Sequence, residues 1–151
     1  MGILEMKHIS KAFSGVYANE EVDLSVEKGE IHALLGENGA GKTTLMNILF
    51  GIYAADSGEV LWKGKKVHFA SPKDAIAEGI GMVHQHFSLV NKMSVLDNVV
   101  LGLKGTGVFV DRKAAKERLL ALSEKYGLQV EPDAKINSLS VGQQQRVEIL
   151  K

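Results

Sequence analysis

A short apolar run, a glycine-rich loop and a helix-forming stretch follow one another between residues 31 and 50, and this succession restricts the fold most. Residues 31–35 read Ile-His-Ala-Leu-Leu, and residues 36–41 read Gly-Glu-Asn-Gly-Ala-Gly. An apolar run of this length predicts a strand that is buried on both faces of a parallel sheet. Residues 42–50 predict a helix that ends at Gly51. Its inward-facing positions would be Leu45, Ile48 and Leu49. An α/β fold is therefore expected.

Residues 36–43 fit the pattern G-x-x-x-x-G-K-[ST], which is known as the P-loop. A triphosphate must be wrapped by backbone N–H groups, and glycines leave that approach open. The next helix directs the positive end of its dipole at the same phosphates. Lys42 would add a full charge for the β- and γ-phosphates, and Thr43 a hydroxyl for Mg²⁺. The candidate nucleotide-binding residues of this loop are Gly36, Asn38, Gly39, Ala40, Gly41, Lys42, Thr43 and Thr44.

The alternative for this segment is a glycine-rich turn that precedes a helix by chance. It is disfavoured because the motif has an apolar strand pattern before it and a helix pattern after it, as phosphate binding requires. The motif indicates a nucleotide, but by itself it does not specify which nucleotide or what work is done.

The rest of the chain alternates between strand and helix patterns. Strand patterns occupy residues 3–13, 22–26, 58–62, 66–69 and 80–83, and the third and fourth predict a hairpin around Lys63-Gly64-Lys65. Helices are expected to begin at the N-cap residues Ser71, Ser94, Asp111 and Ser140. The first three would end near residues 79, 103 and 127, and the last continues to residue 151.

Composition excludes several classes of protein. The 151 residues include 18 Lys plus Arg and 18 Asp plus Glu, so a strongly electrostatic nucleic-acid binder is not expected. The apolar runs are far shorter than the roughly 20 residues of a transmembrane helix. The chain has no cysteine, which excludes disulfides and thiolate zinc sites. Its first ten residues lack the apolar stretch of a secretory signal, so export is not expected.

A second motif lies at residues 139–146, which read Leu-Ser-Val-Gly-Gln-Gln-Gln-Arg. Alone, it predicts a helix start in which Ser140 and Gln143 form a capping box. Together with the P-loop, it makes the chain resemble the nucleotide-binding subunit of an ATP-binding-cassette (ABC) transporter, whose signature is LSGGQ. Val141 departs from the family pattern, which has glycine there. The resemblance implies that Ser140, Gly142 and Gln143 face the γ-phosphate of an ATP held by a second cassette.

Two further positions acquire a role through this resemblance. Gln85 follows the strand pattern of residues 80–83, where the family has its Q-loop glutamine. The resemblance implies that Gln85 contacts Mg²⁺ and the attacking water, and that it acts in catalysis with Lys42. Phe13 resembles the aromatic residue that stacks on adenine in the family, with Tyr17 as a rival candidate. A phenylalanine that only packs in the core is the alternative for Phe13.

The resemblance covers residues 3–151 and implies a P-loop NTPase (RecA-like) core with an antiparallel β subdomain and a helical subdomain. It assigns residues 1–86 to the β subdomain and P-loop core, 87–139 to the helical subdomain and 140–151 to the start of the signature helix. The Walker B strand and switch histidine of the family are not found after the signature. The chain is therefore expected to be an N-terminal piece, truncated before Walker B and inactive in hydrolysis alone. Residues 31–35 and 80–83 would then lack neighbouring strands.

The function implied is ATP binding and hydrolysis coupled to solute uptake by an ABC importer. Residues 81–87 and 139–151 look most like the branch that takes up nucleosides and simple sugars, in which two cassettes occur in tandem. The implied cofactors are ATP and Mg²⁺. The implied partners are a second cassette and transmembrane permease subunits at the cytoplasmic face of the membrane, without nucleic acid. The alternatives are a soluble ABC-type ATPase outside transport and, for these residues alone, a nucleotide-binding module without turnover.

Overall fold

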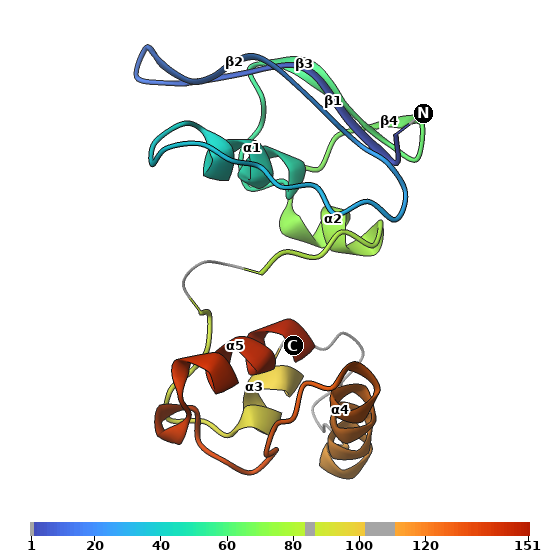
Figure 1. The fold of residues 1–151 in the computed structure, drawn as a ribbon, viewed down its shortest axis with the longest axis vertical. Helices are drawn as coiled ribbons and strands as arrows, with labels where there is room; N and C mark the ends of the chain where they lie inside the picture. The colour runs from blue at the N-terminus through green and yellow to red at the C-terminus, as the bar shows by residue number, and fades with distance from the viewer. Residues whose placement is uncertain (1, 84–86, 102–110) are drawn as a thin grey trace. The chain divides into compact units, whose positions relative to one another are not determined.

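The computed structural model describes residues 2–83, 87–101 and 111–151. Contacts within the chain separate it into two compact units, Met1–Met82 and Val83–Lys151 (Figure 1). Each unit has a hydrophobic core of its own, and each is therefore described by itself.

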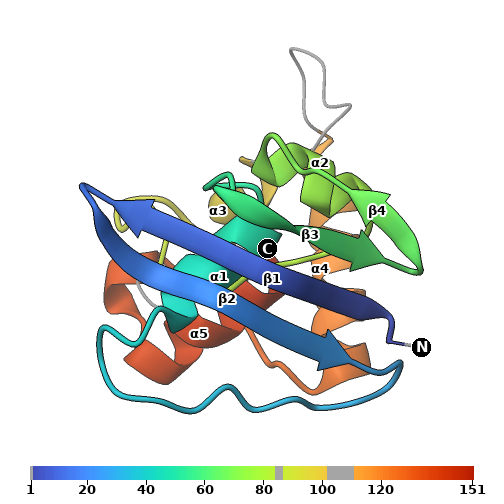
Figure 2. The ribbon, with the colours of Figure 1, turned by 90° about the horizontal axis from the view of Figure 1, so that it is seen from above.

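The first unit contains a four-stranded antiparallel sheet with the strand order β2-β1-β3-β4 (Figure 2). The strands are β1 (Leu4–Phe13), β2 (Val16–Val26), β3 (Ser57–Trp62) and β4 (Lys65–Val67). The predicted hairpin is confirmed, because β3 and β4 are joined at Lys63 and Gly64, whose φ angles are 52° and 76°. Two left-handed residues in succession suit the twist of a tight antiparallel connection. The expected antiparallel β part of the fold is thus present.

Helix α1 (Lys42–Leu49) lies against one face of this sheet (Figure 1). Its residues Leu45 and Ile48 pack with Leu4, Met6 and Ile9 of β1 in a shared core. The predicted helix and two of its three predicted inward positions are therefore confirmed, while Leu49 is only partly buried. The burial of this apolar stripe holds the segment that precedes α1 in place at the edge of the sheet.

Helix α2 (Pro72–Ala77) begins after Ser71, as predicted. It ends two residues before Gly79, whose φ is 88°. The hydroxyl of Ser71 donates a hydrogen bond to Asp74 at 3.0 Å. Ala75 packs with Phe50 and Phe69 in a small separate cluster.

Two strand predictions are wrong. Residues 31–35 and 80–83 form neither strand nor helix, and the side chains of Ile31 and Leu35 are 99% and 89% exposed. A strand of a parallel sheet exists only through hydrogen bonds to neighbouring strands. Within the described residues, the sheet pairs β1 to β4 only, so neither apolar run has a ladder to join.

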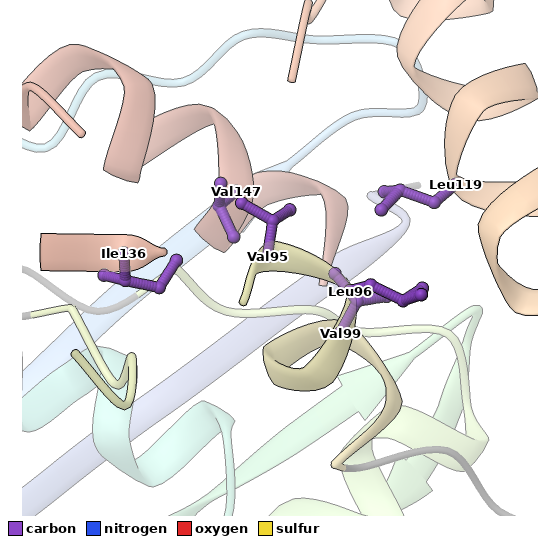
Figure 3. Close-up of a cluster of buried hydrophobic side chains, with 6 residues drawn as sticks. All are labelled: Val95, Leu96, Val99, Leu119, Ile136 and Val147. Atoms are coloured by element: carbon purple, nitrogen blue, oxygen red, sulfur yellow. The ribbon is translucent and has the colours of Figure 1, made fainter. Parts of the chain in front are cut away.

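The second unit is helical. It contains α3 (Val95–Val100), α4 (Arg112–Tyr126), the short 3₁₀ helix η1 (Ile136–Ser138) and α5 (Val141–Leu150). One residue or more from each of these elements enters a single core, drawn in Figure 3. The members of this core are Val95, Leu96, Val99, Leu119, Ile136 and Val147.

All three predicted caps of the helical unit are confirmed. The Asp111 side chain accepts hydrogen bonds from the backbone N–H groups of Lys113 and Ala114, and Ser94 accepts one from Asp97 N–H. At the other end of α4, Gly127 has the left-handed φ of 65° that a C-terminal stop requires. Helix α3 ends at Val100, and the later part of the helix predicted to residue 103 lies outside the described residues.

In the described ranges, no helix combines the length and the apolar character that are needed to cross a bilayer.

Candidate nucleotide-binding site

The P-loop contacts the sheet directly at Gly41, because this residue has no side chain to keep the two backbones apart. A Cβ atom added to Gly41 would lie 2.1 Å from the carbonyl oxygen of Ala18 on β2. Gly41 is buried and its φ is 81°, a conformation that L side chains rarely adopt. Both restrictions select glycine at this position. The last glycine of the motif therefore lets the start of α1 press directly on the backbone of β2.

Asn19 reinforces this contact and was not identified from the sequence. Its side chain is 6% exposed, and its Nδ2 donates a hydrogen bond to the carbonyl oxygen of Gly41 at 3.3 Å. Asn19 Oδ1 is also buried and accepts no hydrogen bond from any described residue. The available signal was a single asparagine in the segment that precedes the alternating residues 22–26, which is weak on its own.

Lys42 lies over the loop that precedes it. Its ammonium group donates to the carbonyl oxygens of Gly36 and Glu37, at 2.6 Å and 2.7 Å. These two bonds hold the ammonium group against the start of the loop and use two of its three N–H donors. The loop itself turns at Gly39, whose φ is 87°. One donor of Lys42 thus remains for an anion.

The first turn of α1 carries no acidic residue. Thr43 is exposed there, and residues 36–40 of the loop are exposed as well. Backbone N–H groups at a helix start have no partner within the helix, and the dipole favours negative charge at that end. The eight predicted P-loop residues therefore form one segment in which residues 36–40 are exposed, Gly41 is buried and Lys42 supplies a positive charge. Together with the helix N-terminus, this segment suits the phosphates of a nucleotide.

The described residues offer few ligands for a metal ion. In the part of the chain that the structure describes, no three histidine, cysteine or carboxylate groups lie close enough to hold a metal. Mg²⁺ commonly binds through substrate phosphates with few protein ligands, so the Thr43 hydroxyl fits a shared site of that kind. Gln85, the other predicted metal ligand and catalytic residue, lies outside the described residues.

The predicted adenine-stacking residue Phe13 ends β1, and its ring packs edge-on against Tyr53 with centroids 5.3 Å apart. Its side chain is 43% exposed, so it is not a buried core phenylalanine. The rival Tyr17 is 58% exposed and directly precedes Ala18, the residue that faces Gly41. Both aromatic residues therefore lie at the turn end of the β1–β2 hairpin, close in sequence to Ala18, which contacts Gly41 of the P-loop. Tyr53 was not anticipated from the sequence.

The signature residues belong to the second unit and form the N-terminus of α5. The predicted capping box is present, since Ser140 N–H donates to Gln143 Oε1 at 2.8 Å and Gln143 N–H donates to Ser140 Oγ at 3.3 Å. Val141 is 71% exposed. A Cβ added to Gly142 would meet nothing within 4 Å, so this chain itself does not require glycine there.

Comparisons with known proteins identify the family of the chain. The family described as "ABC transporter" matches residues 19–151. The guanosine import ATP-binding protein NupO of Bacillus subtilis (strain 168) is 54% identical over 151 residues, which are 99% of this chain and 29% of NupO. The galactose/methyl galactoside import ATP-binding protein MglA of Escherichia coli (strain K12) is 47% identical over 150 residues, which are 99% of this chain and 30% of MglA. The chain thus spans less than a third of these relatives.

A solved structure shows the same fold. It is the ADP conformation of an ATP-binding cassette of an ABC transporter, which superposes with a TM-score of 0.84 at 29% identity. The match covers 99% of this chain and 63% of the cassette. The antiparallel sheet, the P-loop with α1 and the helical unit are therefore parts of a P-loop NTPase cassette. On the family match and this fold, the chain belongs to the ABC transporter family.

Proposed function

We propose that this chain holds ATP with Mg²⁺ at its P-loop and supplies the ATP-binding part of an ABC importer subunit. The observation that carries the proposal is the close contact of Gly41 with β2. This contact positions Lys42 and the start of α1 beside one exposed loop. A chance glycine-rich turn would not require a lysine whose ammonium group is bonded to the carbonyl oxygens of Gly36 and Glu37.

The residues would act as follows. Backbone N–H groups of residues 39–44 donate to the β- and γ-phosphates, and Lys42 adds a charge-assisted hydrogen bond. The Thr43 hydroxyl would hold Mg²⁺, which when bound would neutralise part of the phosphate charge. The family resemblance implies that Gln85 would also hold the metal ion and would orient the attacking water. Phe13 stacks on the adenine ring.

A second cassette is proposed to complete the site. In it, the α5 N-terminus of one copy presents Ser140, Gly142 and Gln143 to the γ-phosphate that the P-loop of the other holds. The open space around Gly142 supports this role, because glycine there permits close approach by a group from outside the chain. The tandem arrangement of two cassettes stays a prediction from the resemblance.

The transmembrane permease subunits are the second proposed partner, and they would place the chain at the cytoplasmic face of the membrane. The proposed solute is a nucleoside or a simple sugar. Sequence identity favours a nucleoside as the solute, because the chain is 54% identical to the guanosine import protein NupO and 47% identical to the galactose/methyl galactoside import protein MglA. A soluble ABC-type ATPase outside transport is less favoured, because both of these relatives are named as import proteins.

We further propose that the 151 residues bind ATP without turning it over. Hydrolysis needs a positioned water and a fully held Mg²⁺. In the ABC family, an apolar run followed by Asp-Glu supplies the carboxylates for these two roles. Residues 144–151, which follow the signature, contain no such run. Phosphate release should therefore be no faster than that of a Lys42→Ala variant, and robust Mg²⁺-dependent release would contradict this part of the proposal.

Titration calorimetry with ATP and Mg²⁺ tests the binding proposal. Removal of the Lys42 charge in Lys42→Ala should weaken binding by about 30-fold or more. Lys73→Ala is the matched control, because Lys73 is exposed on α2 and lies outside the P-loop. Equal affinities for wild type and Lys42→Ala would refute the P-loop assignment.

A further inference from the structure

Asp56, a residue of the loop before β3, is tied to the end of β1 by three hydrogen bonds. Its Oδ1 accepts from Lys11 Nζ at 2.7 Å and its Oδ2 accepts from Ala12 N–H at 2.8 Å. Its own N–H donates to the carbonyl oxygen of Ser10 at 2.8 Å. These contacts fix the three residues that directly precede Phe13.

Lys11, one of these three residues, and Tyr53 both contact the Phe13 ring. The ammonium of Lys11 lies 5.6 Å from the ring centroid, within the range of a cation–π contact. Tyr53 packs against the ring at an interplanar angle of 71°, the edge-to-face arrangement that aromatic pairs favour. Because the ring is nonetheless 43% exposed, it is held in orientation while part of its surface remains open.

We propose that Asp56 and Tyr53 are positioning residues that hold Phe13 in the orientation that stacks on the nucleotide base. This inference rests on the proposed function and deepens it. Asp56 acts through Lys11 and the Ala12 backbone, whereas Tyr53 acts on the ring directly. A ring that is already oriented loses less conformational freedom when a base binds, so the base is bound more tightly.

The charge state of Asp56 suits this role. The hydrogen bond from Lys11, and next to it the bond from Ala12 N–H, hold the pKa of Asp56 below its ordinary value. The carboxylate therefore stays ionised at neutral pH and keeps both bonds. These contacts also favour Phe13 over the rival Tyr17 as the stacking residue, because both ring contacts, from Lys11 and from Tyr53, are made with Phe13.

Comparison of ATP with inorganic tripolyphosphate tests the proposal, since both ligands occupy the P-loop and only ATP has a base. Calorimetry would use the wild type, Phe13→Ala, Tyr53→Leu and Asp56→Ala, with Asp74→Ala as the control. Asp74 is an exposed carboxylate of the same unit that bonds to Ser71 instead. Circular dichroism and thermal melting of each variant would verify folding.

Base–aromatic stacking predicts a loss of ATP affinity of about tenfold for Phe13→Ala. Asp56→Ala and Tyr53→Leu should each lose about fivefold, from the loss of ring orientation. Asp56→Asn should fall between Asp56→Ala and wild type, because the amide oxygen still accepts from Ala12 N–H. Tripolyphosphate affinity should stay at the wild-type value in every variant, and Asp74→Ala should bind both ligands normally.

Two results would overturn the inference. One is wild-type ATP affinity in Asp56→Ala and Tyr53→Leu. The other is an equal loss of ATP and tripolyphosphate affinity, which would assign both residues to folding alone. A wild-type chain that binds neither ligand would instead refute the proposed function itself, and the inference with it.

Discussion

Gly41 and Ala18 approach each other so closely that no side chain fits between them, since a Cβ on Gly41 would lie 2.1 Å from the Ala18 carbonyl oxygen. This contact joins the P-loop helix to the second strand of the sheet. The fold and the candidate site therefore depend on the same backbone contact.

The first prediction follows from this contact. Gly41→Ala must displace the backbone of β2 or of α1 and must also hold alanine at a φ of 81°. The free energy of unfolding should fall by about 2 kcal/mol or more, and ATP affinity should fall with it. Urea denaturation measures the first effect. Gly142→Ala is the control, because its added Cβ meets nothing within 4 Å, and its stability should change by less than about 1 kcal/mol.

The second prediction concerns Asn98, which is fully buried in the helical unit. Its Oδ1 accepts from Val90 N–H at 2.7 Å, and its Nδ2 donates to the carbonyl oxygens of Val90 and Ser94 at 3.2 Å and 2.9 Å. Asn98→Ala leaves these buried groups without their partner and should cost about 2–3 kcal/mol. Asn137→Ala, at an exposed position, should leave the urea midpoint nearly unchanged. Similar midpoints for the two variants would contradict this reading of Asn98.

The third prediction concerns the α5 capping box. Ser140→Ala removes the acceptor for Gln143 N–H and should destabilise the helical unit by about 1 kcal/mol. Ser140→Asp restores a good N-cap acceptor, so its stability should return to near that of wild type. Thermal unfolding of the three proteins measures both effects. A loss in Ser140→Asp as large as in Ser140→Ala would show that capping does not account for the role of Ser140 in stability.

The fourth prediction is a pH dependence set by Asp97. A hydrogen bond from the Ser94 hydroxyl, and next to it the contact with Arg112, hold the pKa of Asp97 below its ordinary value. A carboxylate with a lowered folded-state pKa stabilises the fold above its unfolded-state pKa of about 4. This contribution is lost as the pH falls from about 4 through the lower folded-state value.

Urea unfolding of wild type and Asp97→Asn at several pH values measures this contribution. The difference in unfolding free energy between the two proteins should be constant from neutral pH to about 5 and should shrink below about 4. A difference that is the same at pH 7 and at pH 3 would show that ionisation of Asp97 does not contribute.

Local signals in the sequence were sufficient for most helix boundaries. The caps at Ser94, Asp111 and Ser140 depend on hydrogen bonds between residues two or three positions apart, so the pattern contains both partners. The stop at Gly127 and the turn at Gly64 depend on a φ that glycine alone adopts easily. These elements were predicted correctly for that reason.

Contacts between distant residues were not predictable in the same way. The apolar runs at residues 31–35 and 80–83 are read as strands locally, but a strand needs partners that local patterns do not contain. The bonds of Asp56 to Lys11 and of Asn19 to Gly41 join residues 45 and 22 positions apart. The P-loop itself was found because its motif is contiguous in the sequence. The residues that hold it against the sheet, Ala18 and Asn19, are far from it in the sequence.

Amide chemical shifts of the ¹⁵N-labelled chain, followed while ATP and Mg²⁺ are added, test the central claim most directly. If the loop between the sheet and α1 wraps the phosphates, the largest shifts should occur at the backbone N–H groups of Gly39, Gly41, Lys42, Thr43 and Thr44. Lys42→Ala should greatly reduce these shifts at an ATP concentration close to the wild-type dissociation constant. Saturable ATP binding that leaves these five amides unshifted would contradict the account.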